Sequence, residues 1–397
     1  MPKKILEFIE KETKGKSYKA IKYCLDDREQ STFDSDGKNP DNMIYGETEQ
    51  LRNYVDLKGK SQELINQQQI YSYFLDGSRR VFKVDDMSFT RDGGKSFKVF
   101  PIVAGQIGVG CCRRYEKRMS KEKFFREIVI AVPDIVKIDN GGGEGYFENL
   151  TNKALNNVDI LKTKDLQINA ILPYSTKEDK TKQDEKKIED RGTAKIQERM
   201  IECEKKMVDQ LVKEKKLNQD NYLIKDGSLE YNPDKSLKQD KYKYQVFKNN
   251  YQYVIGVSKS FSTELCKDTK GKNNPGFIAD LRLYQRTPVI KYVWSKDSRL
   301  GDIQFAIWYI RIREHERTRS PFDGILKIEK ILVREDELRN GIDTELVDFL
   351  SAHIINERKP TCYGSDTRWA NHLYPIFLTE TYVKSQYISE QSFLNLF

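Results

Sequence analysis

Residues 221–229 read Asn-Tyr-Leu-Ile-Lys-Asp-Gly-Ser-Leu, a short apolar run that ends in an acid, a glycine and a hydroxyl residue. The pattern predicts a buried strand with Asp226 at its carboxyl end, where Gly227 lets the backbone turn. A similar stretch occurs earlier, where residues 71–79 read Tyr-Ser-Tyr-Phe-Leu-Asp-Gly-Ser-Arg, with Asp76 in the matching place. Asp-Gly is also a common turn dipeptide, so the two copies together carry the argument. Two carboxylates at neighbouring strand ends would form an oxygen-rich site suited to Mg²⁺ or Mn²⁺.

The composition indicates a protein with a sizeable core and a heavily charged surface. The chain has 397 residues, of which 38% are hydrophobic and 33% are charged. This length suggests two or three domains, or one elaborated α/β domain. The net charge of +8 arises from 69 Lys and Arg against 61 Asp and Glu. This mild excess is compatible with a basic groove but not with a non-specific polycation.

Cysteine and histidine usage argues against a zinc site. The six cysteines show no metal-binding spacing, and there are only three histidines. Free thiols in a reducing compartment are the simplest interpretation. No apolar run is long enough for a membrane span, so we expect a cytoplasmic protein without membrane association.

The pattern up to residue 132 predicts a helical arm followed by a sheet. Residues 3–25 are expected to be helical and residues 26–56 to form a long polar loop. The β-forming runs that follow predict a meander of three antiparallel strands, with Asp76 on the first. These runs are residues 71–75 with a possible continuation at 81–84, 97–110, and 128–132.

A long amphipathic helix is predicted to lead into the Asp226 strand. It covers about residues 186–216, and its apolar stripe consists of Ile188, Ile196, Met200, Cys203, Met207, Leu211 and Val212. Glu198 and Glu202 border this stripe, either as solvated flank or as acids that complete a metal site. Further strands are predicted at residues 251–260, 288–294, 303–312 and 324–333, with helices at 344–356 and from Tyr374 onwards.

Taken in this order, the segments resemble the NurA nuclease family. The resemblance covers roughly residues 70–388, and its most specific parts are the two Asp-Gly-Ser elements and the Gly-Val-Ser-Lys turn that ends at Lys259. It implies an α/β fold with an RNase H-like mixed β-sheet flanked by helices. On this basis we expect an N-terminal helical arm and loop at residues 1–60 and a nuclease domain at residues 61–397, with an insertion at about 136–185.

The resemblance also implies an activity and a set of partners. Members of the family are Mn²⁺- or Mg²⁺-dependent DNA nucleases, and they form homodimers with a DNA channel. They act with a hexameric HerA-type ATPase translocase in DNA end processing or phage defence. By residue, Asp76 and Asp226 match the metal-binding acids. Glu198 would be the helix glutamate, with Glu202 as its alternative, and Lys259 matches the lysine of the turn.

The C-terminal helix departs from the family pattern. A Gly-Tyr-Pro followed by a histidine is usual, whereas this chain has Leu373-Tyr374-Pro375 and Tyr382 at the histidine position. Glu380 or His372 would be the additional metal ligand in its place. Four arginines beside the meander are candidates for contacts with the DNA backbone, the other interpretation being a solvated sheet edge: Arg79, Arg80, Arg113 and Arg114.

Two other functions remain open at this point. A catalytically inactive RNase H-like module could bind DNA or dock onto an ATPase, in which case the Asp-Gly-Ser elements would be structural. An Argonaute-like slicer shares the same core. It would need guide-binding domains, however, and this length leaves little room for them.

Overall fold

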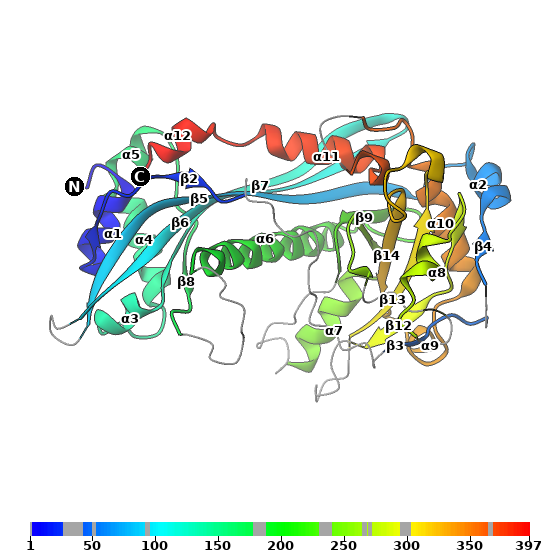
Figure 1. Cartoon of the computed structure of the whole chain (residues 1–397), viewed down its shortest axis with the longest axis horizontal. Helices are drawn as coiled ribbons and strands as arrows, with labels where there is room; N and C mark the ends of the chain where they lie inside the picture. The colour runs from blue at the N-terminus through cyan, green and yellow to red at the C-terminus, as the bar shows by residue number, and fades with distance from the viewer. Residues whose placement is uncertain are drawn as a thin grey trace.

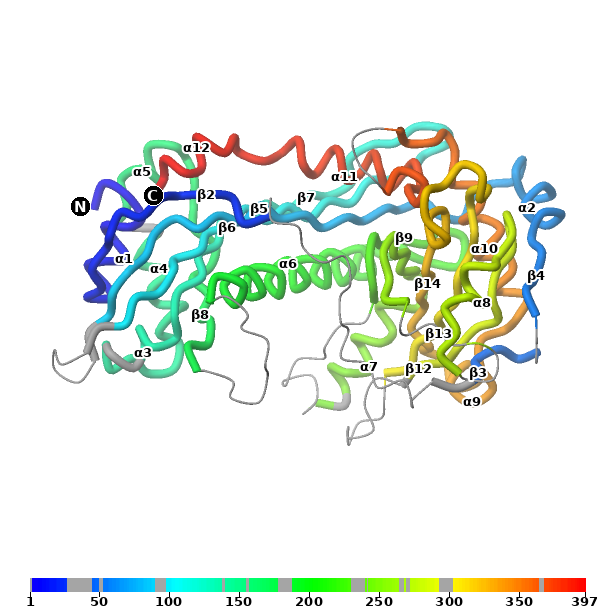
Figure 2. Tube along the Cα trace, viewed as in Figure 1, coloured from blue at the N-terminus to red at the C-terminus, as the bar shows by residue number. Residues whose placement is uncertain are grey.

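The computed structural model describes residues 2–26, 43–49, 53–91, 96–177, 188–229, 240–263, 268, 272–293, 303–363 and 368–397. The molecule is elongated, and three long strands run along it (Figure 1). These are β5 (Tyr71–Arg91), β6 (Ser96–Tyr115) and β7 (Arg118–Pro133). Both termini lie at one end of the molecule (Figure 2).

The strands form one large mixed sheet, in the order β3-β12-β13-β14-β10-β9-β5-β6-β7-β8. Strands β5, β9 and β10 are mutually parallel, and β8 is parallel to β7. The other pairs along this path are antiparallel. The shorter strands are β1 (Lys16–Ser17), β2 (Tyr23–Cys24), β3 (Met43–Tyr45), β4 (Val55–Asp56), β8 (Ala170–Tyr174), β9 (Tyr222–Asp226), β10 (Val254–Ser258), β11 (Gln285–Arg286), β12 (Ile290–Val293), β13 (Gln304–Arg311) and β14 (Ile325–Ile331).

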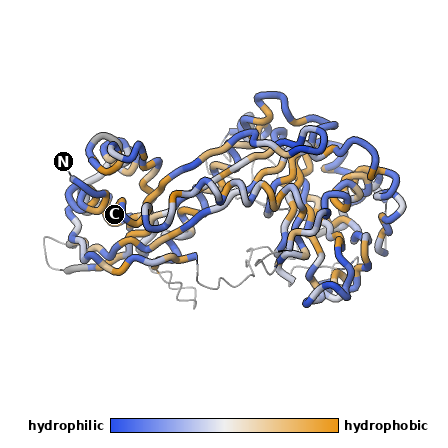
Figure 3. Tube along the Cα trace, turned by 90° about the horizontal axis from the view of Figure 1, so that it is seen from above, coloured by the Kyte–Doolittle hydropathy of each residue, from blue (hydrophilic) through white to orange (hydrophobic). Residues whose placement is uncertain are grey.

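Helices lie on both faces of this sheet, so the predicted mixed α/β class is confirmed. The helices are α1 (Ile5–Thr13), α2 (Lys58–Leu64), α3 (Ile135–Asp139), α4 (Tyr146–Asn157), α5 (Asp159–Thr163), α6 (Ile188–Lys213), α7 (Lys241–Asn250), α8 (Pro275–Ala279), α9 (Glu335–Asn340), α10 (Thr344–Asn356), α11 (Tyr374–Ser385) and α12 (Glu390–Leu394). Hydrophobic residues follow the strands, and polar residues predominate in the loops around them (Figure 3).

The predicted meander is present, but its first strand is much longer than expected. β5 pairs with β6 along almost its whole length, and Asp76 lies opposite Gly110. The stretch from Asp76 to Ser78 is therefore inside a continuous strand and does not form the predicted turn. The glycine serves another purpose here, because a Cβ at position 77 would collide with the carboxylate of Glu204.

Helices α6 and α11 pack against opposite faces of the long strands, with α6 below and α11 above them in Figure 1. Glycines on β6 allow both approaches. A Cβ at Gly105 would lie 2.9 Å from Ile196 of α6, and one at Gly110 would lie 2.5 Å from Val383 of α11. Successive residues of a regular strand point to opposite faces, so number gives the side of each residue from Tyr73 to Phe82 on β5 and from Val103 to Cys111 on β6. Register shifts at Lys83/Asp85 and at Cys111/Cys112 bound these stretches.

The N-terminal segment differs from the predicted helix over residues 3–25. Helix α1 ends at Thr13, and Lys14 adopts the left-handed conformation with φ of 54°. The chain then forms β1 and β2, which pair antiparallel with β5. They cover the stretch of the β5 edge that the short β9 leaves free, and an uncovered strand edge is a site of unwanted pairing.

The predicted loop and the predicted insertion also contribute to the sheet. Within residues 26–56, β3 pairs with β12 and β4 pairs with β11. The rest of that loop falls mainly outside the described residues. In the insertion at 136–185, the chain forms α3, α4, α5 and β8, and β8 extends the sheet beside β7.

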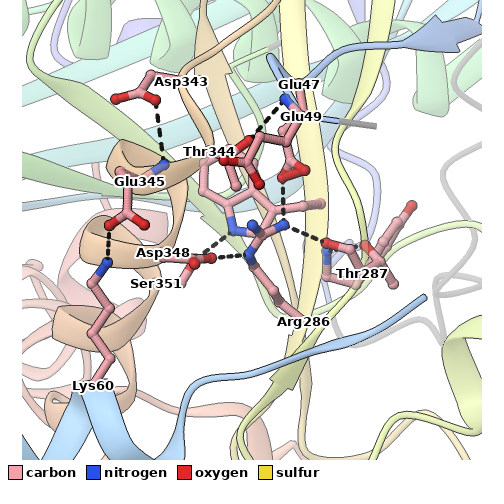
Figure 4. Close-up of polar contacts among 12 residues, drawn as sticks. Glu47, Glu49, Lys60, Arg286, Thr287, Asp343, Thr344, Glu345, Asp348 and Ser351 are labelled. Carbon is pink, nitrogen blue, oxygen red and sulfur yellow. Dashed lines mark hydrogen bonds and ion pairs between the residues drawn. The ribbon is translucent and has the colours of Figure 1, made fainter. Parts of the chain in front are cut away.

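A buried arginine holds the β3 segment to the sheet and to α10. Arg286 on β11 is fully buried, and its guanidinium lies 2.5 Å from Glu47 Oε1 and 2.5 Å from Asp348 Oδ1 (Figure 4). It also donates to the carbonyl oxygen of Thr287 at 3.0 Å. Buried charges are stable only when they are paired in this way. Removal of Arg286, Glu47 or Asp348 would therefore leave a buried charge without its partner.

Among the described helices, none is both long enough and apolar enough to cross a membrane.

Candidate functional site

The two Asp-Gly-Ser elements lie side by side in the sheet. Strands β5 and β9 are parallel, and Leu75 pairs with Lys225, so Asp76 and Asp226 follow at adjacent positions. Gly227, with φ of 84°, turns the chain away immediately afterwards. Its N–H donates to the carbonyl oxygen of Val257 at 2.9 Å, which fixes the turn against β10. Asp76 therefore borders the place where β9 ends and β5 continues.

A lysine and a third carboxylate complete the cluster on the α11 face. Lys259 follows β10, and its Nζ lies 2.8 Å from Asp226 Oδ2. The same Nζ lies 3.1 Å from Glu380 Oε2 on α11. His372, just before α11, has its Nδ1 4.0 Å from that Glu380 oxygen. The predicted residues Asp76, Asp226, Lys259 and Glu380 thus come together, and His372 borders them.

The electrostatics of the cluster reflect an excess of buried negative charge. Burial, and next the charge of Asp226, raise the pKa of Asp76 well above its ordinary value. Burial alone would also raise the pKa of Glu380, but Lys259 and Lys384 lower it to about 2. Burial works against the charge on Lys259, yet Asp226 and Glu380 hold its pKa above the ordinary value. One buried ammonium therefore faces three carboxylates.

One carboxylate oxygen of the cluster is unsatisfied. Asp76 Oδ2 is buried and accepts no hydrogen bond from the described residues. Hard carboxylate oxygens of this kind are the ligands that Mg²⁺ and Mn²⁺ prefer. Within the described part of the chain, no three His, Cys, Asp or Glu side chains converge on one metal position. The donor chemistry thus fits a divalent cation, while Lys259 pairs with two of the three acids.

The predicted helix glutamates lie outside this cluster. Glu198 pairs with Lys195 at 2.6 Å, and 60% of its side chain is exposed. Glu202 pairs with Arg199 at 2.9 Å, and about half of its side chain is exposed. Both belong to α6, which packs on the face opposite to α11. The structure therefore corrects the expectation that Glu198 or Glu202 lies beside Asp76 and Asp226. The physical reason is helical phase, because the buried stripe of α6 carries these two side chains on its outer border.

The buried acid of α6 is Glu204, which the sequence analysis missed. Its side chain is 3% exposed, and its Oε2 lies 3.1 Å from Nζ of Lys225. Burial raises the pKa of Glu204, and Lys225 opposes this rise. The sequence does contain one indication that Glu204 is buried, because it lies between Cys203 and Met207 on the predicted apolar stripe. An acid within such a stripe indicates a buried partner.

The four arginines proposed for DNA contact have different surroundings. Arg114 is tied to buried Glu357, with 2.5 Å between Nη2 and Oε1. Arg79 pairs with Asp26 and donates to Gln197 at 2.6 Å, on the α6 side of the sheet. Arg113 is exposed beside the rings of two tyrosines. Arg80 lies on the α11 side, 3.5 Å from Glu390 and about half exposed, so it remains available.

The fold and the cluster define a mixed α/β protein in which Asp226 and Lys259, at the carboxyl ends of β9 and β10, meet Asp76 within β5 and Glu380 on α11. Among solved structures, this chain is similar to the NurA nuclease from Sulfolobus solfataricus, with 10% sequence identity and a TM-score of 0.40. The similarity covers 86% of this chain and 92% of that chain. No family model and no curated protein sequence matches the chain. The side chains of the cluster therefore provide the basis for a function.

Proposed function

We propose that this chain is a divalent-metal-dependent deoxyribonuclease that hydrolyses phosphodiester bonds. The observation that carries the proposal is the buried Oδ2 of Asp76, which has no hydrogen-bond partner among the residues that the structure describes and lies beside Asp226, Lys259 and Glu380. An unsatisfied buried carboxylate oxygen costs folding free energy, and a functional role is one reason for a protein to retain it. Excess buried carboxylate is a recurrent feature of catalytic metal sites.

In this proposal, Asp76, Asp226 and Glu380 would hold Mn²⁺ or Mg²⁺. The chemistry that such a cation supplies is activation of a water and neutralisation of charge on the leaving oxygen. Lys259 keeps its positive charge at neutral pH and binds a phosphate oxygen of the DNA as a point charge. For that contact, Lys259 would have to leave its ion pairs with Asp226 and Glu380, which would then be free to hold the cation.

The DNA backbone would pass over the α11 side of the sheet, where Arg80 is the accessible candidate for a phosphate contact. Contacts of this kind make binding salt-dependent and largely indifferent to base sequence. By the sequence resemblance, we further propose that the protein acts as a homodimer with a hexameric HerA-type ATPase. The setting would be DNA end processing or defence against phage.

One observation favours a second candidate, a catalytically inactive RNase H-like module that binds DNA or a partner protein. Lys259 bridges Asp226 and Glu380, so the lysine itself occupies two of the three carboxylates. In an inactive module these ion pairs would be permanent. The two candidates differ in whether a divalent cation displaces them.

The deciding experiment is digestion of linear DNA by the purified protein, with Mn²⁺ or with EDTA, and with or without a co-expressed ATPase. The Asp76→Ala and Asp226→Asn variants should abolish Mn²⁺-dependent digestion while remaining folded by circular dichroism. Glu198→Ala is the matched control, and it should digest DNA at the parent rate because its side chain faces solvent. Digestion by both aspartate variants at the parent rate would refute the assignment of the site.

A further inference from the structure

The carboxylate of Glu204 lies on the opposite side of the sheet from Asp76. A Cβ at Gly77 would collide with Glu204 Oε1, which places Glu204 against β5 on its α6 face. Asp76 precedes Gly77 in the strand, so its side chain points to the other face, towards α11. Glu204 therefore touches β5 directly behind the first acid of the cluster.

The same carboxylate also contacts β9 directly behind the second acid. Its Oε2 lies 3.1 Å from Nζ of Lys225, the residue before Asp226. That Nζ donates to the carbonyl oxygen of Asp226 at 2.8 Å and to that of Ser228 at 3.3 Å. The ammonium thus spans the turn at Gly227, and Glu204 holds the ammonium.

A second charged pair supports the same turn from β14. Glu329 Oε2 accepts hydrogen bonds from Ser228 Oγ at 2.8 Å and from the N–H of Leu229 at 2.6 Å. Lys327 pairs with Glu329 at 2.5 Å. Buried charges on the face away from the cluster therefore hold the backbone that carries Asp226, in addition to the hydrogen bond from the Gly227 N–H to Val257.

We infer that the buried Glu204–Lys225 pair is a positioning device that holds Asp76 and Asp226 at the spacing a divalent cation needs. The inference rests on the proposed function. A small apolar pair would fill the same space, but it would not bond the two carbonyl oxygens. Groups behind metal ligands are known to set ligand geometry, and their removal weakens metal binding without any direct contact to the metal.

The test removes both charges together, because removing one alone leaves a buried unpaired charge and threatens folding. The paired variant Glu204→Leu/Lys225→Met is compared with the parent and with Asp190→Asn, an exposed acid on the same helix. Glu204→Gln, which retains an oxygen towards Lys225, is measured in parallel, so that the test does not depend on the paired variant alone. The readouts are thermal unfolding, Mn²⁺ binding by calorimetry, and hydrogen exchange of the Gly227 and Leu229 amides.

We expect the paired variant to melt close to the parent but to bind Mn²⁺ about 10- to 100-fold more weakly. Its Gly227 and Leu229 amides should exchange about tenfold faster, while amides in the middle of β6 keep the parent rate. In Mn²⁺ affinity and amide exchange, Glu204→Gln should lie between the parent and the paired variant, and Asp190→Asn should match the parent.

Parent-like Mn²⁺ affinity and amide exchange in the paired variant, or in Glu204→Gln if the paired variant does not fold, would overturn the inference and leave the proposed function intact. A parent that neither binds Mn²⁺ nor digests DNA would instead overturn the proposed function, and the inference with it.

Discussion

At the scale of single residues, Asp76 and Lys259 have opposite effects on the cluster. Asp76 is buried and faces other negative groups, and no described residue donates a hydrogen bond to its Oδ2. Lys259 is buried among those groups and offsets part of their charge through its ion pairs with Asp226 and Glu380. Functional sites commonly combine such a costly group with a compensating one, so stability and activity should respond in opposite directions to changes at Asp76.

The Asp76→Asn variant should be more stable than the parent in the absence of metal. The amide removes a carboxylate whose charged form is disfavoured, and each unit of pKa shift is worth about 1.4 kcal/mol, so we expect a gain of about 1 kcal/mol or more at pH 7. Chemical denaturation of both proteins in EDTA measures this gain. A variant less stable than the parent would show that the Asp76 carboxylate has a stabilising partner.

The pH dependence of the free energy of unfolding should reveal the raised pKa of Asp76. A carboxyl group whose pKa is raised by folding stabilises the protein below the pKa of the unfolded chain, about 3.9, and this contribution is lost as pH rises through the folded-state pKa. Between pH 4 and pH 8, the free energy of unfolding in EDTA should therefore fall more steeply for the parent than for Asp76→Asn. Parallel curves would contradict the raised pKa.

Removal of the lysine should destabilise the metal-free protein and make it respond more strongly to metal. Lys259→Met leaves Asp226 and Glu380 without their shared cation, and breaking a buried pair costs about 3–5 kcal/mol. Because a ligand stabilises the folded state that binds it, Mn²⁺ should raise the melting temperature of the variant more than that of the parent. An equal or smaller rise would argue that the carboxylates hold no metal.

At the scale of elements, the site depends on how closely α11 approaches β6. Glu380 is carried by α11, and the helix contacts the sheet at glycine positions. Gly110 lies opposite Asp76, and a Cβ there would come within 2.5 Å of Val383. The glycine therefore sets the distance between Glu380 and the strand that carries Asp76.

The Gly110→Ala variant should push α11 outward, at a cost of about 1–3 kcal/mol, and should also weaken Mn²⁺ binding. Val383→Ala creates space at the same contact, so the two changes should be less harmful together than their sum. A double-mutant cycle of unfolding free energies measures this coupling. Strictly additive effects would show that the contact does not limit the approach of the helix.

At the scale of the whole molecule, the end that carries both termini is packed as a core of its own, away from the cluster. Phe393 on α12 is fully buried, with its ring centroid 5.3 Å from that of Phe82 on β5. The N–H of Ile5 donates to the carbonyl oxygen of Leu396 at 3.1 Å, which joins α1 to the C-terminus. The stability of this end and the chemistry at the other end should therefore be separable.

The Phe393→Ala variant should lose about 3–5 kcal/mol of stability through the cavity it leaves. At a temperature where the variant is still folded, its Mn²⁺ affinity should equal that of the parent. Urea denaturation and calorimetry on the same preparation test the two statements. A matching loss of Mn²⁺ affinity would show that packing at this end controls the cluster.

The amino-acid sequence by itself determined the elements that local pattern encodes. The long α6 helix, the meander, β9, β10 and the α11 helix follow from apolar periodicity and from glycine and proline placement, which act over a few residues. The positions of Asp226 at a strand end and of Lys259 after the next strand could be predicted for the same reason, because each residue follows a short apolar run.

Only the tertiary structure decided which face each side chain occupies and what it meets there. Glu198 and Glu204 are six positions apart on one helix, yet one reaches solvent and the other reaches β5 and β9. The continuity of β5 through Asp76, the β1 and β2 strands in place of a longer helix, and the pairing of Arg114 with Glu357 likewise depend on contacts between segments distant in the chain. Local propensity is weak compared with the free energy of burying a charge or covering a strand edge, so these contacts override it.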